Sequence, residues 1–223
     1  MVINKPAGFH VHPPEKNADK APRSKIILQQ LRDQLNCFVF PVHRLDVPTS
    51  GALLFALNSE AAGELNRSLQ LPTAKKKYWA IVRGFMEAEG EIDLPLKSDS
   101  SSEYLAARTY FRGLHRVEVA KAVGVKHQTS RYSWLEVKIE TGRFHQIRRH
   151  MNRIAHPVIG DSDHGDSRHN QFFRNEFGIS GLCLHCFELH FEFRGRGYKV
   201  FAQPPSKWEK ICDLFQIKSY PSG

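Results

Sequence analysis

The sequence predicts an α+β protein with a mixed, mostly antiparallel sheet flanked by helices. Residues 135–139 alternate apolar and charged side chains, which is the period of a strand with one solvent-facing side. Residues 27–35 instead repeat apolar side chains at helical spacing. Because helical and strand patterns follow each other in mixed order along the chain, an α+β arrangement is indicated.

The first half is expected to contain two helices and two strands. Ser24 is expected to cap the helix over residues 27–35. The apolar run Gly51 to Leu57 predicts a buried strand that follows the polar loop 41–50. Ser59 is expected to open a second helix through Leu69, and residues 78–82 predict another strand.

The second half adds helices and strands around a basic segment. The strand at residues 135–139 is expected to end at Thr141-Gly142, and a helix follows with Ile147, Met151 and Ile154 on its apolar face. His145, Arg148, Arg149 and Arg153 are then available to other faces. Strands are expected over 182–193 and 198–202, and a capping box from Ser206 to Glu209 predicts a short final helix.

Length and composition indicate one sizeable domain, or two closely packed lobes, with an ordinary globular core. The net charge of +9 favours a polyanionic partner, although charge alone does not require one. There is no apolar run near the ~18 residues that span a bilayer and no signal peptide at the start, so we expect a cytoplasmic protein without membrane contact. Four scattered cysteines are expected to stay reduced.

The most informative segment is the loop His43 to Gly51, which carries Asp46 immediately before the apolar strand. Catalytic groups concentrate on loops that rigid strands hold in place. A lone aspartate in a loop can equally cap a turn or pair with Arg44 on the surface. The loop is therefore a candidate active-site segment, and the choice between a catalytic and a structural role for Asp46 depends on the other segments of the chain.

Two further segments are basic. Residues 141–150 form a basic helix, for which either a solvated charged face or a phosphate-binding face is a sufficient explanation. Residues 75–84 place a run of lysines before Tyr78 and Trp79, a combination suited to RNA because lysines neutralise phosphate and an aromatic ring stacks on an unstacked base. Packing of Tyr78 or Trp79 in the core is the alternative.

These three segments, in this order, resemble the RluA-type pseudouridine synthases. Residues 155–161 and 182–185 match the two segments that usually follow in that family, so the resemblance covers nearly the whole chain. It implies the pseudouridine synthase catalytic fold with a central RNA-binding cleft. It also implies a single catalytic domain over residues 1–223, without a separate N-terminal RNA-binding domain, that isomerises uridine in RNA as a monomer and needs no cofactor.

Within the family, His164 stands where most members carry tyrosine, and Pro48 lies inside the catalytic loop. Both features are similar to the tRNA-modifying branch, the C-type tRNA pseudouridine synthases, which implies a uridine at position 65 in the T-stem of tRNA. Ribosomal RNA is the alternative substrate, and a catalytically idle RNA-binding protein on the same scaffold is the alternative activity. The polar stretch 98–103 and the segment 119–131 are expected to influence the choice of RNA.

The resemblance also implies roles for individual residues. Asp46 is the essential carboxylate, which can attack C1′, add to the base or remove a ribose proton. Arg148 is expected to pair with Asp46 and keep it ionised, and Tyr78 to stack on the flipped uracil. The residues expected near the vacated base or the phosphates are Arg44, His43, Lys75, Lys76, Lys77, Arg143 and Arg149.

Metal binding is an alternative that the spacing of possible ligands does not favour. Cys183 and Cys186 have a two-residue spacing but lack a second ligand pair at zinc-finger distance. The acidic loop with Asp161, Asp163 and Asp166 suits a hard cation in a nuclease-like site, but turn formation explains it better. We therefore expect no metal. A nuclease would shorten RNA, whereas isomerisation leaves the chain uncut.

Overall fold

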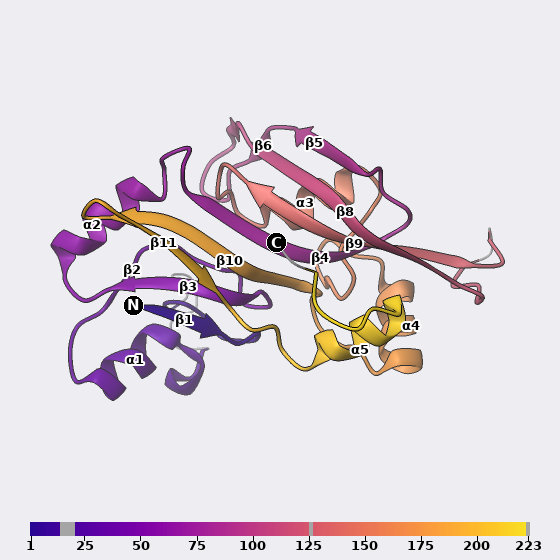
Figure 1. The fold of residues 1–223 in the computed structure, drawn as a ribbon, viewed down its shortest axis with the longest axis horizontal. Coiled ribbons are helices and arrows are strands. Elements are labelled where there is room, and N and C mark those ends of the chain that lie inside the picture. Colours follow the sequence, from indigo (N-terminus) through magenta and orange to yellow (C-terminus); the bar gives the residue numbers. More distant parts are fainter. Residues whose placement is uncertain (14–20, 125–126, 222–223) are drawn as a thin grey trace. The chain divides into compact units, whose positions relative to one another are not determined.

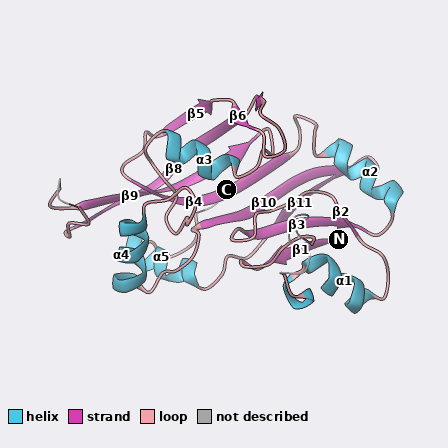
Figure 2. Ribbon diagram, turned by 180° about the vertical axis from the view of Figure 1, so that it is seen from behind, coloured by secondary structure: helices cyan, strands magenta, loops and turns pink. Residues whose placement is uncertain are grey.

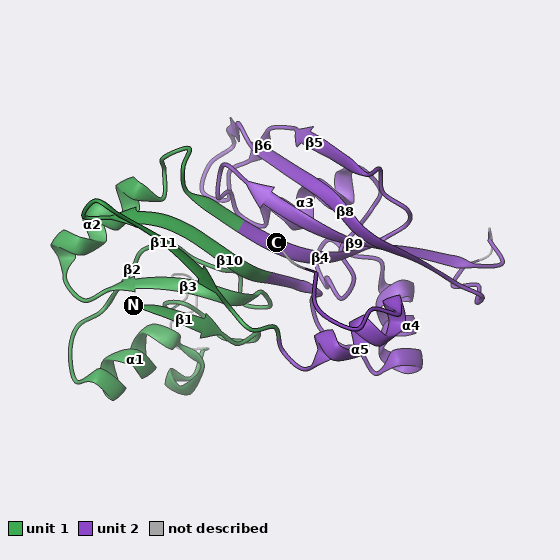
Figure 3. Cartoon of the chain, viewed as in Figure 1, with its two compact units in different colours: residues 1–76, 186–204 green, residues 77–185, 205–223 purple. Residues whose placement is uncertain are grey.

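The structure, a computed structural model, describes residues 1–13, 21–124 and 127–221. It contains two compact units: residues 1–76 with 186–204, and residues 77–185 with 205–223 (Figure 3). Both units are discontinuous in sequence because strands β4 (Lys75–Arg83) and β10 (Leu184–Phe193) each pass from one unit into the other (Figure 1). The single catalytic domain expected over residues 1–223 stays a prediction.

The first unit is built around strand β3 (Ser50–Ala56), in which all seven residues are buried. Strand β1 (Val2–Lys5) pairs with β3 in antiparallel register, with Lys5 opposite Gly51. The short strand β2 (Phe40–Pro41) pairs with the other end of β3, and strand β11 (Arg196–Phe201) pairs with β10. The predicted buried strand is confirmed, but it ends at Ala56, and Leu57 is exposed.

Two α-helices complete this unit (Figure 2). Helix α1 (Ile27–Leu35) follows a 3-10 turn, Arg23–Lys25, that contains Ser24. Its N-cap is Ile26, which makes no side-chain capping bond, so the expected Ser24 cap is wrong. Helix α2 (Ser59–Ser68) begins at Ser59 as predicted, and Asn58 caps it by accepting the Ala61 N–H. Both helices lie where the periodicity predicted them, and only the cap of α1 differs from expectation.

The second unit carries an antiparallel hairpin formed by β8 (Arg108–Val119) and β9 (Ser130–Ile139). Strand β5 (Glu89–Asp93) pairs with β8, and β4 neighbours β9. Strands β6 (Leu96–Lys97) and β7 (Tyr104–Leu105) form a separate two-stranded sheet. The alternating pattern at 135–139 correctly predicted part of β9, whereas β5 to β8 were not predicted.

Three helices belong to the second unit. Helix α3 (Gln146–Arg153) buries Ile147 and Met151 as predicted. Helix α4 (Ser167–Phe177) was not predicted, although Asp166 caps it by accepting the Arg168 N–H and Gly178 ends it with φ 62°. Helix α5 (Lys207–Phe215) starts where expected, but Ser206 has helical dihedrals and makes no side-chain bond, so the expected capping box is absent.

Packing in the second unit centres on aromatic rings. Trp134 and Trp208 are fully buried, and the ring centroids of these two residues lie 5.2 Å apart. All four cysteines are free thiols, and only Cys37 is exposed. Among the helices of the described residues, none has the length and apolar character needed to cross a membrane. The helices and the predominantly antiparallel pairings confirm the α+β class, while the central RNA-binding cleft stays a prediction.

Candidate functional site

The loop that carries Asp46 is fixed to strand β3 at both ends. Before Asp46, the Val42 N–H donates to the Leu54 carbonyl at 3.0 Å, and the Leu54 N–H donates to His43 Nε2 at 3.2 Å. After it, the Thr49 N–H donates to the Asp46 carbonyl at 3.0 Å and closes a turn. Asp46 itself is half-buried at this turn. The loop therefore holds its carboxylate at a defined position, as expected for a catalytic group.

Lys5 supports the same loop from strand β1. Its side chain is fully buried, and Nζ donates to the carbonyls of Pro6, Phe9 and Val47 at 2.9, 2.9 and 3.1 Å. Burial lowers the pKa of Lys5 to about 8, and the charge of Asp46 acts in the opposite direction. Sequence reasoning missed this residue because lysines are almost always exposed, so nothing in the pattern marks a buried one.

His43 faces the protein interior rather than solvent. Burial, and then the charge of Lys76, lower its pKa to about 4, so the ring is neutral at physiological pH. Nε2 accepts the Leu54 N–H, which places the ring proton on the buried Nδ1. This geometry makes His43 a support of the loop and differs from the RNA contact expected from the sequence. The neighbouring Arg44 is exposed, as a residue that meets RNA must be.

Gly51 is required where the loop enters β3. Its φ is +122°, a region that favours glycine. A methyl group at this position would lie 2.2 Å from the carbonyl oxygen of Cys186 in β10. Gly51 thus allows the two strands to approach closely directly after the loop.

Arg148 is buried on α3 and is oriented by two aspartates. Its Nε and Nη2 donate to the two oxygens of Asp161 at 2.7 and 2.6 Å, and Nη2 also reaches Asp163 at 2.7 Å. The side chain is 1% exposed, which is compatible with the expected position of Arg148 in a closed pocket. The helix packs Arg148 inward because a buried carboxylate compensates its charge.

Asp161 organises the turn that follows α3. Burial raises its pKa, but the hydrogen bonds from Arg148 and from the His164 and Asp163 amides outweigh this and hold the pKa below its usual value. The sequence predicted that this acidic stretch forms a turn. The prediction is confirmed, because the Asp161 carboxylate accepts hydrogen bonds from the backbone N–H groups of residues 163 and 164. Nothing in the sequence indicated the ion pair between Asp161 and Arg148.

The remaining expected residues of the second unit make local contacts. Tyr78 is buried, and Lys77 Nζ lies 3.6 Å from Glu136 Oε2. Arg143 donates to the Ala106 carbonyl at 3.1 Å, and Arg149 donates to the carbonyls of Lys97 and Phe144 at 3.0 and 3.2 Å. The two arginines therefore hold the chain around β6 and β7 as well as carrying charge.

In the first unit, the structure places Lys5 near Asp46 and Lys76 near His43. Burial lowers the pKa of Lys76. The pairing of Asp46 with Arg148 stays a prediction, as does the stacking role of Tyr78.

One cluster in the described part of the chain has the side chains to ligate a metal ion. The ligand atoms of His145, Asp163 and His164 all lie within 4.8 Å of one another, and His145 Nδ1 is 3.1 Å from His164 Nε2. Asp163 is already bound to Arg148, whose positive charge opposes a cation there. Cys183 and Cys186, which the sequence singled out, are buried and do not belong to this cluster.

Known proteins resemble this chain in both sequence and fold. The sequence profile described as RNA pseudouridylate synthase matches residues 1–153. The chain is 40% identical to tRNA pseudouridine synthase C of Vibrio parahaemolyticus over 97% of this chain and 91% of that protein. It is 44% identical to the protein of the same name from Haemophilus ducreyi, over 96% and 91%.

Two solved human structures have a similar fold. Human RNA pseudouridylate synthase domain containing 4 superimposes with a TM-score of 0.72 at 19% identity, over 98% of this chain and 90% of that chain. Human RNA pseudouridylate synthase domain containing 1 gives a TM-score of 0.70 at 24% identity, over 92% and 79%. These likenesses support the fold alone.

Proposed function

This chain belongs to the RNA pseudouridylate synthase family and is an isomerase that converts uridine to pseudouridine in RNA, and we propose that its substrate is a uridine in the T-stem of tRNA. Relatives at 40 to 44% identity, each matched over most of its own length, bear the name tRNA pseudouridine synthase C. They support tRNA over ribosomal RNA as the substrate. We further propose that the chain acts as a monomer in the cytoplasm, where tRNA is available.

The reaction breaks the bond from ribose C1′ to uracil N1 and forms a bond from C1′ to C5. The proton on C5 is released and a proton is gained at N1, so nothing is oxidised and no co-reactant is consumed. The site needs a carboxylate that acts on the sugar or the base. We assign this role to Asp46. The observation that carries the assignment is the turn at Asp46, which Val42, His43 and Lys5 fix from both sides.

Arg148 and Tyr78 are proposed to serve the same uridine. Arg148 donates from Nε and Nη2 to the two oxygens of Asp161, and this bidentate pair fixes the plane of its guanidinium. Extrusion of the target base costs a few kcal/mol, and stacking of the base on an aromatic ring offsets about 1–3 kcal/mol. Tyr78 is proposed to supply that ring, and the exposed Arg44 to enter the space that the base leaves.

The assignment is tested by tritium release from tRNA labelled at uridine C5. The intact protein should release tritium, and Asp46→Asn should reduce the rate by at least about a thousandfold, as loss of a nucleophile does in other enzymes. Asp213→Asn, on the exposed surface of α5, is the matched control and should keep the wild-type rate. Both variants should bind tRNA and melt at the wild-type temperature.

The alternatives give different results in the same assay. A catalytically idle RNA-binding protein would bind tRNA without release of tritium. Release from ribosomal RNA but not from tRNA would replace the proposed substrate. Shortened RNA would indicate a nuclease. Chemical mapping of pseudouridine in cells with and without the protein then tests the T-stem position.

A further inference from the structure

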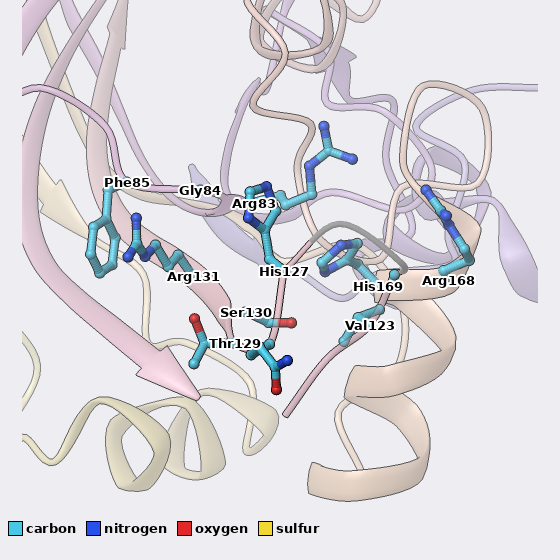
Figure 4. Close-up of a pocket in the computed structure, with 12 residues that line it drawn as sticks. Arg83, Gly84, Phe85, Val123, His127, Thr129, Ser130, Arg131, Arg168 and His169 are labelled. Carbon is cyan, nitrogen blue, oxygen red and sulfur yellow. The ribbon is translucent and has the colours of Figure 1, made fainter. Parts of the chain in front are cut away.

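A cavity lies within the second unit, and all of its lining residues belong to that unit. Its volume is about 670 Å³, and it is bordered by the end of β4, the turn between β8 and β9, and the start of α4. Figure 4 shows its lining residues. Residues 123–124 and 127–131, which belong to the segment that the sequence singled out as a possible influence on the choice of RNA, form one wall. None of the residues assigned above to the isomerisation lines this cavity.

The cavity is cationic. Arg83, Arg131 and Arg168 line it together with His127 and His169 (Figure 4). The Tyr132 hydroxyl lies 2.8 Å from His169 Nδ1, which fixes that imidazole in the wall. Figure 4 shows Arg131 beside Phe85 on one side of the cavity and Arg168 on the opposite side, so guanidinium groups from separate elements border the same space, which favours an anionic ligand.

Two of the arginines are positioned to bind such a ligand. Arg83 is tied into the structure because it donates to Asp166 at 2.6 Å. Arg131 and Arg168 have side chains that are 56% and 65% exposed, and their carboxylate contacts are longer, at 3.2 and 3.5 Å. Exposed ion pairs of this kind contribute little to the free energy of folding. A phosphate can therefore replace the carboxylates as the partner of these arginines with little loss of stability.

An aromatic ring lies beside these charges. Phe85 is 37% exposed, and the Arg131 guanidinium carbon is 5.1 Å from its ring centroid. Nucleic-acid sites for unpaired bases combine cationic groups for the backbone with aromatic rings or arginine planes on which a base stacks. The volume of the cavity lies within the range of pockets that enclose small organic ligands, and a single nucleotide is a ligand of that kind.

We propose that this cavity binds one nucleotide of the substrate RNA other than the reacting uridine. Arg131 and Arg168, on opposite sides of the cavity, bind the phosphates on the two sides of this nucleotide, and its base stacks against Phe85 and the Arg131 guanidinium. The inference rests on the proposed RNA substrate and extends it, because it assigns a contact to the RNA outside the isomerisation site. It also explains how the segment 119–131 takes part in the choice of RNA.

The test compares two double variants in tRNA binding, measured by fluorescence anisotropy over a range of salt concentrations. Arg131→Gln with Arg168→Gln removes two proposed phosphate contacts. Loss of two contacts should lower the slope of log affinity against log salt by about 1.4 and weaken binding about 25-fold near 0.1 M salt. Arg174→Gln with Arg196→Gln removes the same charge from exposed positions outside the cavity and should change the affinity less than about threefold.

Phe85→Leu tests the stacking contact separately. Loss of a ring under a base should weaken tRNA binding at least about fivefold and leave the salt slope unchanged. In the tritium assay, both cavity variants should raise KM for tRNA rather than lower kcat, whereas a merely structural role would lower kcat and the melting temperature together.

Several outcomes would overturn the inference. One is a salt slope for the Arg131 and Arg168 double variant equal to that of the wild type. Another is an equal loss of affinity in the control variant. If uridine monophosphate or inorganic phosphate binds the cavity while tRNA binding is unaffected by the variants, the site takes free anions and not RNA. Failure of the proposed function can be distinguished from failure of this inference. In the first case the wild type would release no tritium, while the differences in tRNA binding between the variants could still be measured.

Discussion

The buried ion pair between Arg148 and Asp161 gives a quantitative prediction. Asp161→Asn keeps the size of the side chain but leaves the Arg148 guanidinium, which is 1% exposed, without its buried charge partner. Breaking a buried pair in this way costs about 3–5 kcal/mol. For a chain of this length each kcal/mol shifts the melting temperature by about 2–4 °C, so the variant should melt about 6–20 °C below the wild type.

The matched control is Asp163→Asn. Asp163 contacts the same Nη2 atom at 2.7 Å, but its side chain is 53% exposed. An exposed pair contributes about 0–1 kcal/mol, so this variant should melt within about 4 °C of the wild type. Thermal unfolding followed by circular dichroism measures both. If the two variants were equally destabilised, burial would not be what gives the Asp161 pair its strength, and the reasoning would be refuted.

The same pair predicts an effect of pH. The pKa of Asp161 is held below its usual value in the folded protein, so its contribution to stability is complete above the unfolded pKa near 4 and is lost as pH falls through the lower folded value. Asp161→Asn should therefore lack this part of the acid destabilisation. Because Asp161 also orients Arg148, the variant should have a lower kcat in the tritium assay at temperatures where it remains folded.

Two further predictions concern the loop that carries Asp46. Gly51→Ala places a methyl group 2.2 Å from the Cys186 carbonyl oxygen and should destabilise the fold by about 3 kcal/mol or more in denaturant unfolding, whereas Gly63→Ala in α2 should be neutral or stabilising by up to about 1 kcal/mol. The pKa of His43 is lowered to about 4, so the unfolded chain binds more protons than the folded one between pH 4 and 6.5, and stability should fall by about 3 kcal/mol over that interval as pH decreases. His43→Gln should remove this dependence, and an unchanged pH profile in that variant would contradict the buried position of the ring.

Local patterns in the sequence were sufficient for much of the fold and for the loop that carries Asp46. The apolar run after Ser50 predicted β3, and helical spacing predicted α1, α2 and the apolar face of α3, because these features depend on neighbours along the chain. Helix caps were less predictable. Neither Ser24 nor Ser206 makes the expected side-chain bond, since helix ends depend on local backbone geometry that the residue type alone does not fix.

The sequence by itself determined the α+β class, the family and the candidate catalytic loop, since periodicity and motif order are properties of adjacent residues. Only the tertiary structure decided what supports that loop: a buried lysine that donates to three carbonyls, and a histidine ring that faces the interior. It also decided that Asp161, thirteen positions from Arg148, is that arginine's buried partner. Burial and charge pairing arise between segments that only folding brings together, and no local pattern encodes them.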